Sequence, residues 1–304
     1  MTDVRQPAWP YTLVCEDTSA LPREEWLALR QQGIGSSDAA PAMGLSPWSD
    51  AYTLWAEKAG VLPYREQDEV ERFVWGHLME PIIIAEGQRR GVIGECQQHL
   101  MLRSVPYPHL LANPDAIGKG FIVEVKTADG WDEKRWNEGV PDHYVIQAQH
   151  LMIVTGAPYV VFLVLFGGNH LRAFEVAWDD ALADTMLSAL ADFWRRVQEN
   201  DAPDPDGSES AMRTVRDRYL AFEEGGVVEL TGEQMALVED FQMLDLLAKE
   251  DRKRADAIKA RLMVVLGEAE ADTGLFGEDG PVVTWRADKN GKRTMRFPDR
   301  KGKR

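Results

Sequence analysis

Apolar residues recur along this chain with two spacings, and each spacing predicts one type of secondary structure. The unbroken apolar run from Tyr159 to Phe166 predicts a buried strand. The run from Phe121 to Val125 alternates and is rich in β-branched residues, so it predicts another strand. Apolar residues at helical spacing predict long helices over residues 67–90, 179–200 and 233–267. Shorter helices are expected over 22–33 and 51–59 and after Pro141, and further strands at about 92–104.

The helix expected over 67–90 contains an acidic residue beside its apolar stripe. The stripe is expected to face the core and comprises Val70, Phe73, Val74, Leu78, Ile82 and Ala85. Glu80 falls near this stripe, next to Pro81, which removes a helical hydrogen bond and is expected to kink the helix. Glu80 is therefore either a solvated residue on the side of the helix or an acid of a functional site.

The clearest break in the pattern is the segment 201–210, which is rich in proline, glycine and acidic residues. It predicts a linker between a domain over residues 1–200 and a region over residues 211–304. That second region is expected to be helical and to end in a β-hairpin around Asn290 and Gly291. The tip of the hairpin and the tail beyond it are basic, and the tail is either a functional surface or a disordered, solubilising end.

Composition narrows the class of protein. With 304 residues, of which 44% are hydrophobic and 28% charged, the chain has ample material for a core. The chain has no 18-residue apolar run and no signal-peptide pattern, so no membrane span and no signal peptide are expected, and no membrane is expected as a partner. Cys15 and Cys96 are too few for a disulfide framework, so a reducing, cytoplasmic location is expected. The net charge of −16 argues against DNA binding through bulk charge and requires a local basic surface or an enclosing channel if DNA is bound.

The candidate chemistry centres on Asp115, Glu124 and Lys126. Glu124 and Lys126 lie two residues apart on the predicted strand, so their side chains project from the same face. Gly118 and Gly120 allow a tight turn that would bring Asp115 beside Glu124. Two carboxylates suit a hard divalent cation such as Mg²⁺, and a neighbouring lysine can orient a water molecule for attack. The alternative is a surface hairpin with an ordinary cross-strand Glu–Lys pair.

The segments that follow strengthen the catalytic interpretation. The helix after Pro141 places Tyr144, Gln147, His150 and Leu151 on roughly one face. The order strand, strand, helix, strand, with converging acidic and amide groups, resembles the core of the PD-(D/E)XK nucleases.

A second candidate site lies near the N-terminus. Gly35, Ser36 and Ser37 precede a short predicted helix, and free N–H groups with two hydroxyls at a helix start favour an anion. The alternative is a plain helix cap.

Several segments together resemble one family, the phage lambda exonuclease-like (YqaJ-type) viral recombination nucleases. The matching segments occur in the same order over roughly residues 22–200 and are Trp26–Arg30, Gly33–Ala40, Leu45–Trp48, Trp75–Pro81, Ala112–Asp115, Glu124–Lys126 and Gln147–Gly156. The resemblance implies a three-layer α/β PD-(D/E)XK core with a mixed central sheet. It also implies metal-dependent 5′→3′ digestion of linear double-stranded DNA, which leaves 3′ single-stranded overhangs for a phage annealing protein.

The same resemblance assigns roles to individual residues. Asp115, Glu124, the Val125 carbonyl and Glu80 would hold Mg²⁺, with Mn²⁺ as an alternative, and Lys126 would position the water. Gln147 matches the glutamine of the core motif, although Gln149 is close enough to contest the assignment. Arg30, Ser36 and Ser37 match a pocket for the 5′-terminal phosphate. The family further implies a ring-shaped homotrimer encoded by a phage or prophage and acting in the bacterial cytoplasm.

Two other functions fit the same residues. One is a structure- or site-specific endonuclease on the same core, which would cut circular DNA. The other is a DNA-end-binding module whose acidic residues are structural, and this would release no nucleotides.

Overall fold

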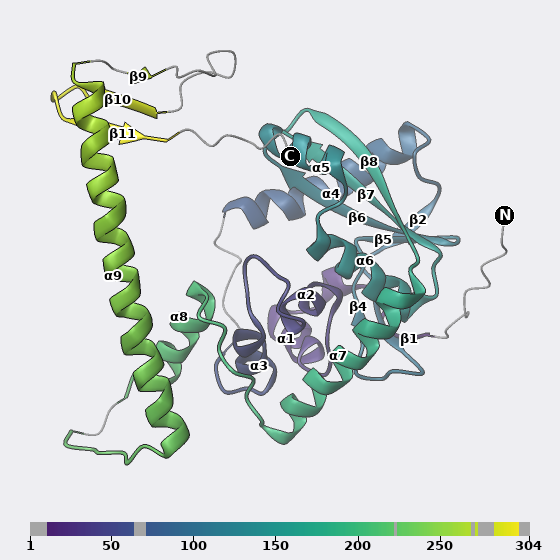
Figure 1. Cartoon of the computed structure of the whole chain (residues 1–304). Helices are drawn as coiled ribbons and strands as arrows, with labels where there is room; N and C mark the ends of the chain where they lie inside the picture. The colour runs from purple at the N-terminus through teal and green to yellow at the C-terminus, as the bar shows by residue number, and fades with distance from the viewer. Residues whose placement is uncertain (1–10, 64–70, 222–223, 269–270, 273–282, 298–304) are drawn as a thin grey trace. The chain divides into compact units, whose positions relative to one another are not determined.

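The computed structural model describes residues 11–63, 71–221, 224–268, 271–272 and 283–297, and its contacts divide the chain into two units, Met1–Phe222 and Glu223–Arg304 (Figure 1). The first unit contains the candidate site and the second contains one long helix with a small sheet. The division lies beyond the expected linker at 201–210.

The centre of the first unit is a five-stranded sheet with the order β2-β5-β6-β7-β8. Its strands are β2 (Cys96–Gln98), β5 (Ala116–Gly118), β6 (Phe121–Ala128), β7 (Tyr159–Phe166) and β8 (His170–Ala177). Strands β6 and β7 are parallel, whereas all other neighbours in this sheet are antiparallel. The sheet is therefore mixed, as predicted, and both strands inferred from apolar runs are present.

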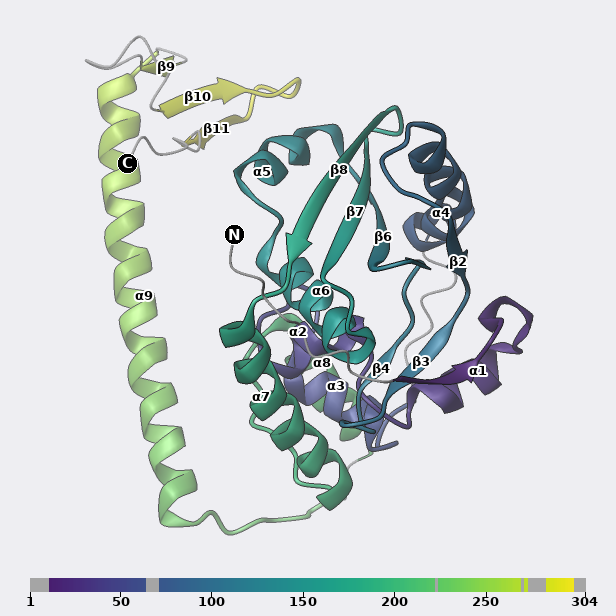
Figure 2. The same ribbon diagram turned by 90° about the vertical axis from the view of Figure 1, so that its right-hand side faces the viewer.

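Helices cover both faces of this sheet, because alternate residues of a strand point to opposite sides. On one face, Val123 and Leu163 pack with Ile83 and Ile84 of α4 (Glu71–Arg89). The other face carries the main apolar core, which includes residues of β7, α6 (Asp142–Thr155) and α7 (Asp180–Glu199). Helix, sheet and helix form the three predicted layers (Figures 1 and 2).

The predicted orientation of α4 is wrong. Val74, Leu78 and Ile82 are exposed, and the buried residues of α4 are Ile83, Ile84 and Gly87; Val70 lies outside the described residues. The second half of α4 is apolar around much of its circumference, so its sequence did not select one face. The sheet selects the face because Gly87 permits close approach: a Cβ atom there would lie 2.7 Å from Leu163 Cδ1.

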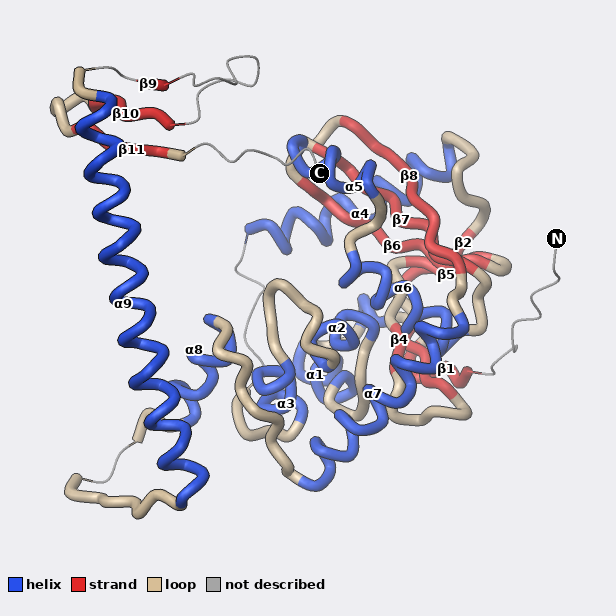
Figure 3. Tube along the Cα trace, viewed as in Figure 1, coloured by secondary structure: helices blue, strands red, loops and turns tan. Residues whose placement is uncertain are grey.

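Most of the remaining elements of the first unit lie on one side of the five-stranded sheet, and several of them contribute residues to the main core (Figure 3). A second sheet has the order β1-β3-β4 and consists of β1 (Tyr11–Cys15), β3 (Met101–Ser104) and β4 (Leu111–Ala112). The other α-helices are α1 (Arg23–Arg30), α2 (Ala39–Ala42), α3 (Ala51–Lys58), α5 (Glu133–Glu138) and α8 (Glu209–Arg218). Short 3-10 helices are η1 (Thr18–Ala20), η2 (Ser36–Asp38) and η3 (Gly130–Asp132).

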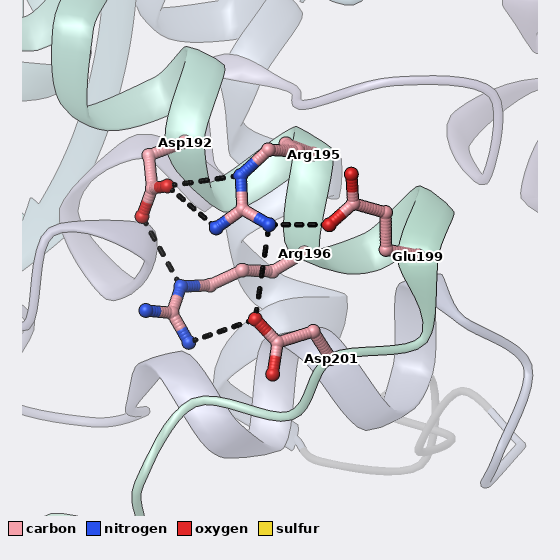
Figure 4. A network of polar contacts seen from close by, with 5 residues as sticks. All are labelled: Asp192, Arg195, Arg196, Glu199 and Asp201. Carbon is pink, nitrogen blue, oxygen red and sulfur yellow. Dashed lines mark hydrogen bonds and ion pairs between the residues drawn. The ribbon is translucent and has the colours of Figure 1, made fainter.

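The segment expected to be a linker is attached to the first unit at both ends. At its start, Asp201 joins an exposed network in which Arg195 and Arg196 of α7 also contact Asp192 (Figure 4). At its end, the Ser210 hydroxyl donates to Asp50 Oδ2 at 2.5 Å. Exposed ion pairs contribute little individually, so the buried contacts of α8 with α3 hold this segment more firmly.

The second unit consists of α9 (Gly232–Leu266) and a sheet with the order β11-β10-β9. The strands are β9 (Ala271–Asp272), β10 (Val283–Ala287) and β11 (Arg293–Arg296), and the last two form the predicted hairpin. Leu266, Val283 and Met295 form a small buried cluster. The basic tail over residues 298–304 lies outside the described residues. Among the helices described, none combines the length and the apolarity needed to cross a membrane.

Candidate active site

The hairpin formed by β5 and β6 places Asp115 beside the segment around Glu124. Gly120 has a φ of 83°, a conformation that glycine adopts at little cost, and it makes the turn between the strands. Ala116 pairs with Val123, so the next residues outward, Asp115 and Glu124, lie at the same end of the hairpin. The Val125 amide donates to Asp115 Oδ2 at 2.6 Å. The predicted proximity of Asp115 to β6 is therefore present.

Glu124 is almost completely buried, with 1% of its surface exposed. Its Oε2 atom accepts hydrogen bonds from Lys126 Nζ at 2.9 Å and from Gln147 Nε2 at 2.6 Å. Its Oε1 atom is buried and has no hydrogen-bond partner among the described residues. A buried carboxylate oxygen without a partner is energetically costly, and this position therefore suits an additional cationic ligand.

Glu80, Asp115 and Glu124 form a carboxylate cluster whose members disfavour one another's ionisation. Burial and the negative charges of Asp115 and Glu124 raise the pKa of Glu80 to about 8. Burial and the charge of Asp115 raise the pKa of Glu124 to about 7. Burial likewise raises the pKa of Asp115, despite the nearby Lys126 and the amide of Val125. Carboxyl groups with such raised pKa values are typical of functional sites.

Lys126 supplies the positive charge next to this cluster. Burial acts to lower its pKa, but the charges of Glu124 and Asp115 outweigh that effect and raise it. The Lys126 ammonium also lies 5.2 Å from the centre of the Tyr144 ring. Lys126 is therefore a fixed cation at neutral pH and not a proton acceptor.

The structure distinguishes between the two candidate glutamines on α6. Gln147 contacts Glu124, as described above. Gln149 is buried at the other side of the helix, where it donates to the Ala177 carbonyl and accepts from the Asp179 amide. Gln147 thus belongs to the site, whereas Gln149 connects α6 to the segment before α7.

The donors present fit a hard divalent cation by their chemistry, because they are carboxylates and one of their buried oxygens lacks a hydrogen-bond partner within the described ranges. Within the described ranges, no three His, Cys, Asp or Glu side chains are already arranged around a common metal position. A cation would therefore have to draw the carboxylate cluster together and displace part of its hydrogen bonding to Lys126 and Gln147.

A second cluster forms around Asp38, in the region predicted to bind an anion. Arg30 Nη2 donates to Ser37 Oγ at 3.1 Å and to Asp38 Oδ1 at 2.7 Å. Lys58 Nζ lies 2.7 Å from Asp38 Oδ2, and its side chain is fully buried. Burial acts to raise the pKa of Asp38, but the two cations outweigh it and lower that pKa. Two cations around one carboxylate leave a net positive charge beside the exposed Ser37 hydroxyl.

The predicted helix start at this position needs correction. Ser36 and Ser37 lie in the 3-10 turn η2, and the α2 helix that follows contains four residues. Because a four-residue helix has only a small dipole, any attraction for an anion comes mainly from Arg30 and Lys58. Ser36 is buried, and Ser37 is the hydroxyl that contacts Arg30. Gly35 allows this tight packing, because a Cβ atom there would lie 3.2 Å from Asp38 Oδ2.

Sequence reasoning missed Lys58 and Asp38 as members of these clusters. It placed Tyr144 on the same helix face as Gln147 but did not predict the contact of its ring with Lys126. Lys58 is the last residue of α3, where a lysine is usually solvated, and nothing in the sequence signals its burial. Both clusters meet α6: Gln147 belongs to the first, and buried residues of the same helix pack with Ile34 and Ala39 on either side of η2.

Comparison with known proteins agrees with this architecture. Residues 25–158 match the model of the YqaJ-like viral recombinase domain family. The uncharacterized protein YqaJ of Bacillus subtilis (strain 168) is 31% identical over 296 residues, which cover 94% of this chain and 92% of that protein. The crystal structure of an alkaline exonuclease (LHK-Exo) from Laribacter hongkongensis superimposes with a TM-score of 0.51 at 18% identity. That match covers 65% of this chain and 100% of the exonuclease, and it shows a shared fold.

Proposed function

Because this chain belongs to the YqaJ-like viral recombinase family, we propose that it is a metal-dependent nuclease that degrades linear double-stranded DNA from its 5′ ends. Family membership supports the coarser statement that the protein is a nuclease. The observation that supports the metal site is the carboxylate cluster, in which one oxygen of the buried Glu124 has no hydrogen-bond partner in the part of the chain that the structure describes.

Asp115, Glu124, Glu80 and the Val125 carbonyl would hold Mg²⁺, or Mn²⁺ in its place. When bound, the cation would neutralise charge on the phosphate and lower the pKa of a bound water. Phosphodiester hydrolysis adds one water across the P–O3′ or P–O5′ bond, so charge develops on the phosphoryl and leaving oxygens. Stabilising that charge is the main demand on the protein.

Lys126 contributes to this stabilisation as a cation. Its raised pKa keeps it protonated, so it can donate hydrogen bonds to the attacking water or to a phosphate oxygen but cannot remove a proton. The side-chain amide of Gln147 donates to the same Glu124 oxygen as Lys126 does, Oε2. Both residues therefore set the orientation of Glu124 before substrate arrives.

The Asp38 cluster supports the choice of the DNA end. A terminal 5′ phosphate carries two negative charges and presents three oxygens, whereas an internal phosphodiester carries one charge. Arg30 and Ser37 offer donors at the exposed edge of a net positive cluster, and Arg30 suits bidentate phosphate contacts. We infer that this cluster binds the 5′-terminal phosphate and thereby sets the polarity.

The proposed product is DNA with 3′ single-stranded overhangs, which a phage single-strand annealing protein would use. A homotrimeric ring around the DNA is proposed as the means of retaining an acidic protein on its substrate, since the net charge of −16 opposes affinity from bulk charge.

The decisive experiment follows linear duplexes labelled at either the 5′ or the 3′ end, with Mg²⁺ or with EDTA. Early release of the 5′ label in Mg²⁺ alone is expected. Cutting of a covalently closed circle would support an endonuclease instead, and absence of any cleavage in Mg²⁺ or Mn²⁺ would support a DNA-end-binding module. Asp115→Asn serves as the inactive control.

A further inference from the structure

The long helix α9 carries a seven-residue repeat of apolar positions. We take Phe241 as the first position of a heptad. The residues at the first and fourth positions of successive heptads, between 237 and 265, are then Leu237, Phe241, Leu244, Ala248, Asp251, Ala255, Ile258, Leu262 and Val265. Eight of these nine positions are apolar, and their spacing alternates strictly between four and three residues. This pattern is the seam of a coiled coil.

Most of this seam is exposed in the described structure. Leu237, Phe241 and Leu244 expose 68%, 69% and 62% of their surfaces, and Ile258 and Val265 expose 58% and 81%. Within the described part of the second unit, the small sheet contacts only the end of the seam, where Leu262 packs with its cluster. A 35-residue helix extends over about 50 Å, and so long an apolar stripe marks a surface that another element covers.

We propose that α9 pairs with α9 of a second copy of this chain as an antiparallel two-helix coiled coil. The charged residues that flank the seam support a second copy as the partner and an antiparallel orientation. The flanking charged residues are acidic in the first half of the helix, at Asp240 and Asp245, and basic in the second half. The basic residues are Arg252, Arg254, Lys259 and Arg261. A helix polarised in this way is complementary to a reversed copy of itself.

One antiparallel register satisfies both the seam and the flanking charges. When Phe241 lies opposite Ile258 of the second copy, Leu237 lies opposite Leu262 and Leu244 opposite Ala255. The flanking positions then pair Asp240 with Arg261 and Asp245 with Arg252, and two-fold symmetry repeats each pair. In this register Asp251, the single polar seam residue, lies opposite the small side chain of Ala248.

The other arrangements place like charges together. A shift by one heptad brings Arg252 opposite Arg252 and Arg254 opposite Arg254 of the second copy. A parallel pair brings Asp240 opposite Asp245 and Arg254 opposite Lys259. Present partners do not prevent the proposed pairing: Asp245 pairs with Lys249 at 2.6 Å on its own helix, and exposed pairs of this kind are weak and exchangeable.

This pairing is independent of the proposed nuclease activity and of any contact between nuclease units. It connects two chains, or two existing assemblies, through their second units. Its signature is therefore a halving of the mass when the seam is disrupted, whatever the state of the first unit.

The test uses the full-length protein at micromolar concentration and measures mass by light scattering after size exclusion. Leu244→Asp places a charge in the seam and should halve the mass. Leu246→Asp is the matched control, because Leu246 is equally exposed at 59% but lies on the opposite side of the helix, and the mass should not change. Far-ultraviolet circular dichroism confirms that both variants keep their helix content.

Charge exchange tests the orientation. Asp240→Arg with Asp245→Arg should halve the mass, and so should Arg252→Asp with Arg261→Asp. Combining all four substitutions restores every antiparallel pair and should restore the full mass, whereas a parallel coiled coil would remain disrupted. If the wild type already has the mass of Leu244→Asp, the seam is covered by the chain's own first unit or by another protein, and the proposal is overturned. Failure of the fourfold variant to recover would overturn the antiparallel arrangement.

Discussion

Replacing Glu124 by glutamine should stabilise the protein while it abolishes catalysis. Glutamine has nearly the same shape as glutamate, and its carbonyl can still accept from Lys126 and Gln147. The substitution removes the negative charge that burial disfavours. The same charge is proposed to hold the cation, so its removal should raise the stability of the protein and lower the cleavage rate.

The magnitude follows from the pKa of Glu124, which burial and Asp115 raise from 4.5 to about 7. The folded state then binds more protons than the unfolded state, so stability falls as pH rises from about 4.5 through about 7. One pKa unit corresponds to about 1.4 kcal/mol, so ionisation of Glu124 costs about 3 kcal/mol above pH 7. Glu124→Gln should recover a large part of this cost as a higher free energy of unfolding. Its cleavage rate should fall at least about 1,000-fold, which corresponds to about 4 kcal/mol of activation barrier.

The assay is urea unfolding in EDTA at pH 8.5 and at pH 4.5, followed by tryptophan fluorescence. The signal reports mainly on the first unit, because nine of the ten tryptophans precede residue 223 and only Trp285 follows it. The variant should be more stable than wild type at pH 8.5, and the difference should shrink at pH 4.5. Mg²⁺ should then stabilise the wild type and have little effect on the variant.

Glu86→Gln is the matched control. Hydrogen bonds from Arg89 and Arg90 lower the pKa of the partly exposed Glu86 to about 2, so removing that charge should give no stabilisation at pH 8.5. A Glu124→Gln protein that is less stable than wild type at pH 8.5 would refute the burial argument. Cleavage within tenfold of wild type would refute the assignment of the site.

Four further outcomes are expected. The wild-type cleavage rate should rise with pH through about 7 to 8, because protons compete with the cation for the carboxylate cluster. A higher Mg²⁺ concentration should move the midpoint of this rise to lower pH. A cleavage rate that stays constant from pH 6 to 9 would contradict the prediction. Lys126→Met should lower turnover at least 100-fold, while calorimetry at pH 8.5 shows Mg²⁺ binding unchanged or tighter; tenfold weaker binding would make Lys126 part of the metal site. Arg30→Gln should reduce the rate advantage of 5′-phosphorylated over dephosphorylated duplex at least tenfold, and equal wild-type rates on the two substrates would refute the phosphate pocket. Gln149→Leu should lower the free energy of unfolding by about 1–3 kcal/mol, since the Ala177 carbonyl and the Asp179 amide lose their partner. Its turnover should stay within threefold of the wild-type value, and a larger loss of turnover would assign Gln149 to the site.

The sequence alone was sufficient for features that depend on neighbouring residues. The strand from Tyr159 to Phe166 was predicted with its observed bounds, because a continuous apolar run of that length fits a strand buried on both faces. The position of Asp115 beside the end of β6 was predictable because a two-residue period and a glycine-containing turn fix the hairpin within about ten residues. The long helix α9 and the hairpin after it were predictable for the same reason.

Tertiary structure decided which face of each helix is buried. Gln147 and Gln149 are about 200° apart around α6, so they face opposite sides; only the packing of α6 on the sheet determines that Gln147 meets Glu124. In α4, apolar residues lie on several sides, and the close contact that Gly87 permits with Leu163 selected Ile83 and Ile84 as the buried pair.

Tertiary structure also created the charge clusters. Lys58 and Asp38 are twenty positions apart, and their types alone predict solvated side chains. Folding buries both, and the ion pairs of Asp38 with Lys58 and Arg30 then stabilise the negative charge of Asp38 against the cost of its burial. The raised pKa values of Glu80 and Glu124 arise in the same way, since they require burial and the approach of carboxylates from α4, β6 and the residue before β5. Local periodicity determines elements and turns, whereas burial and electrostatic coupling depend on long-range packing that no local pattern specifies.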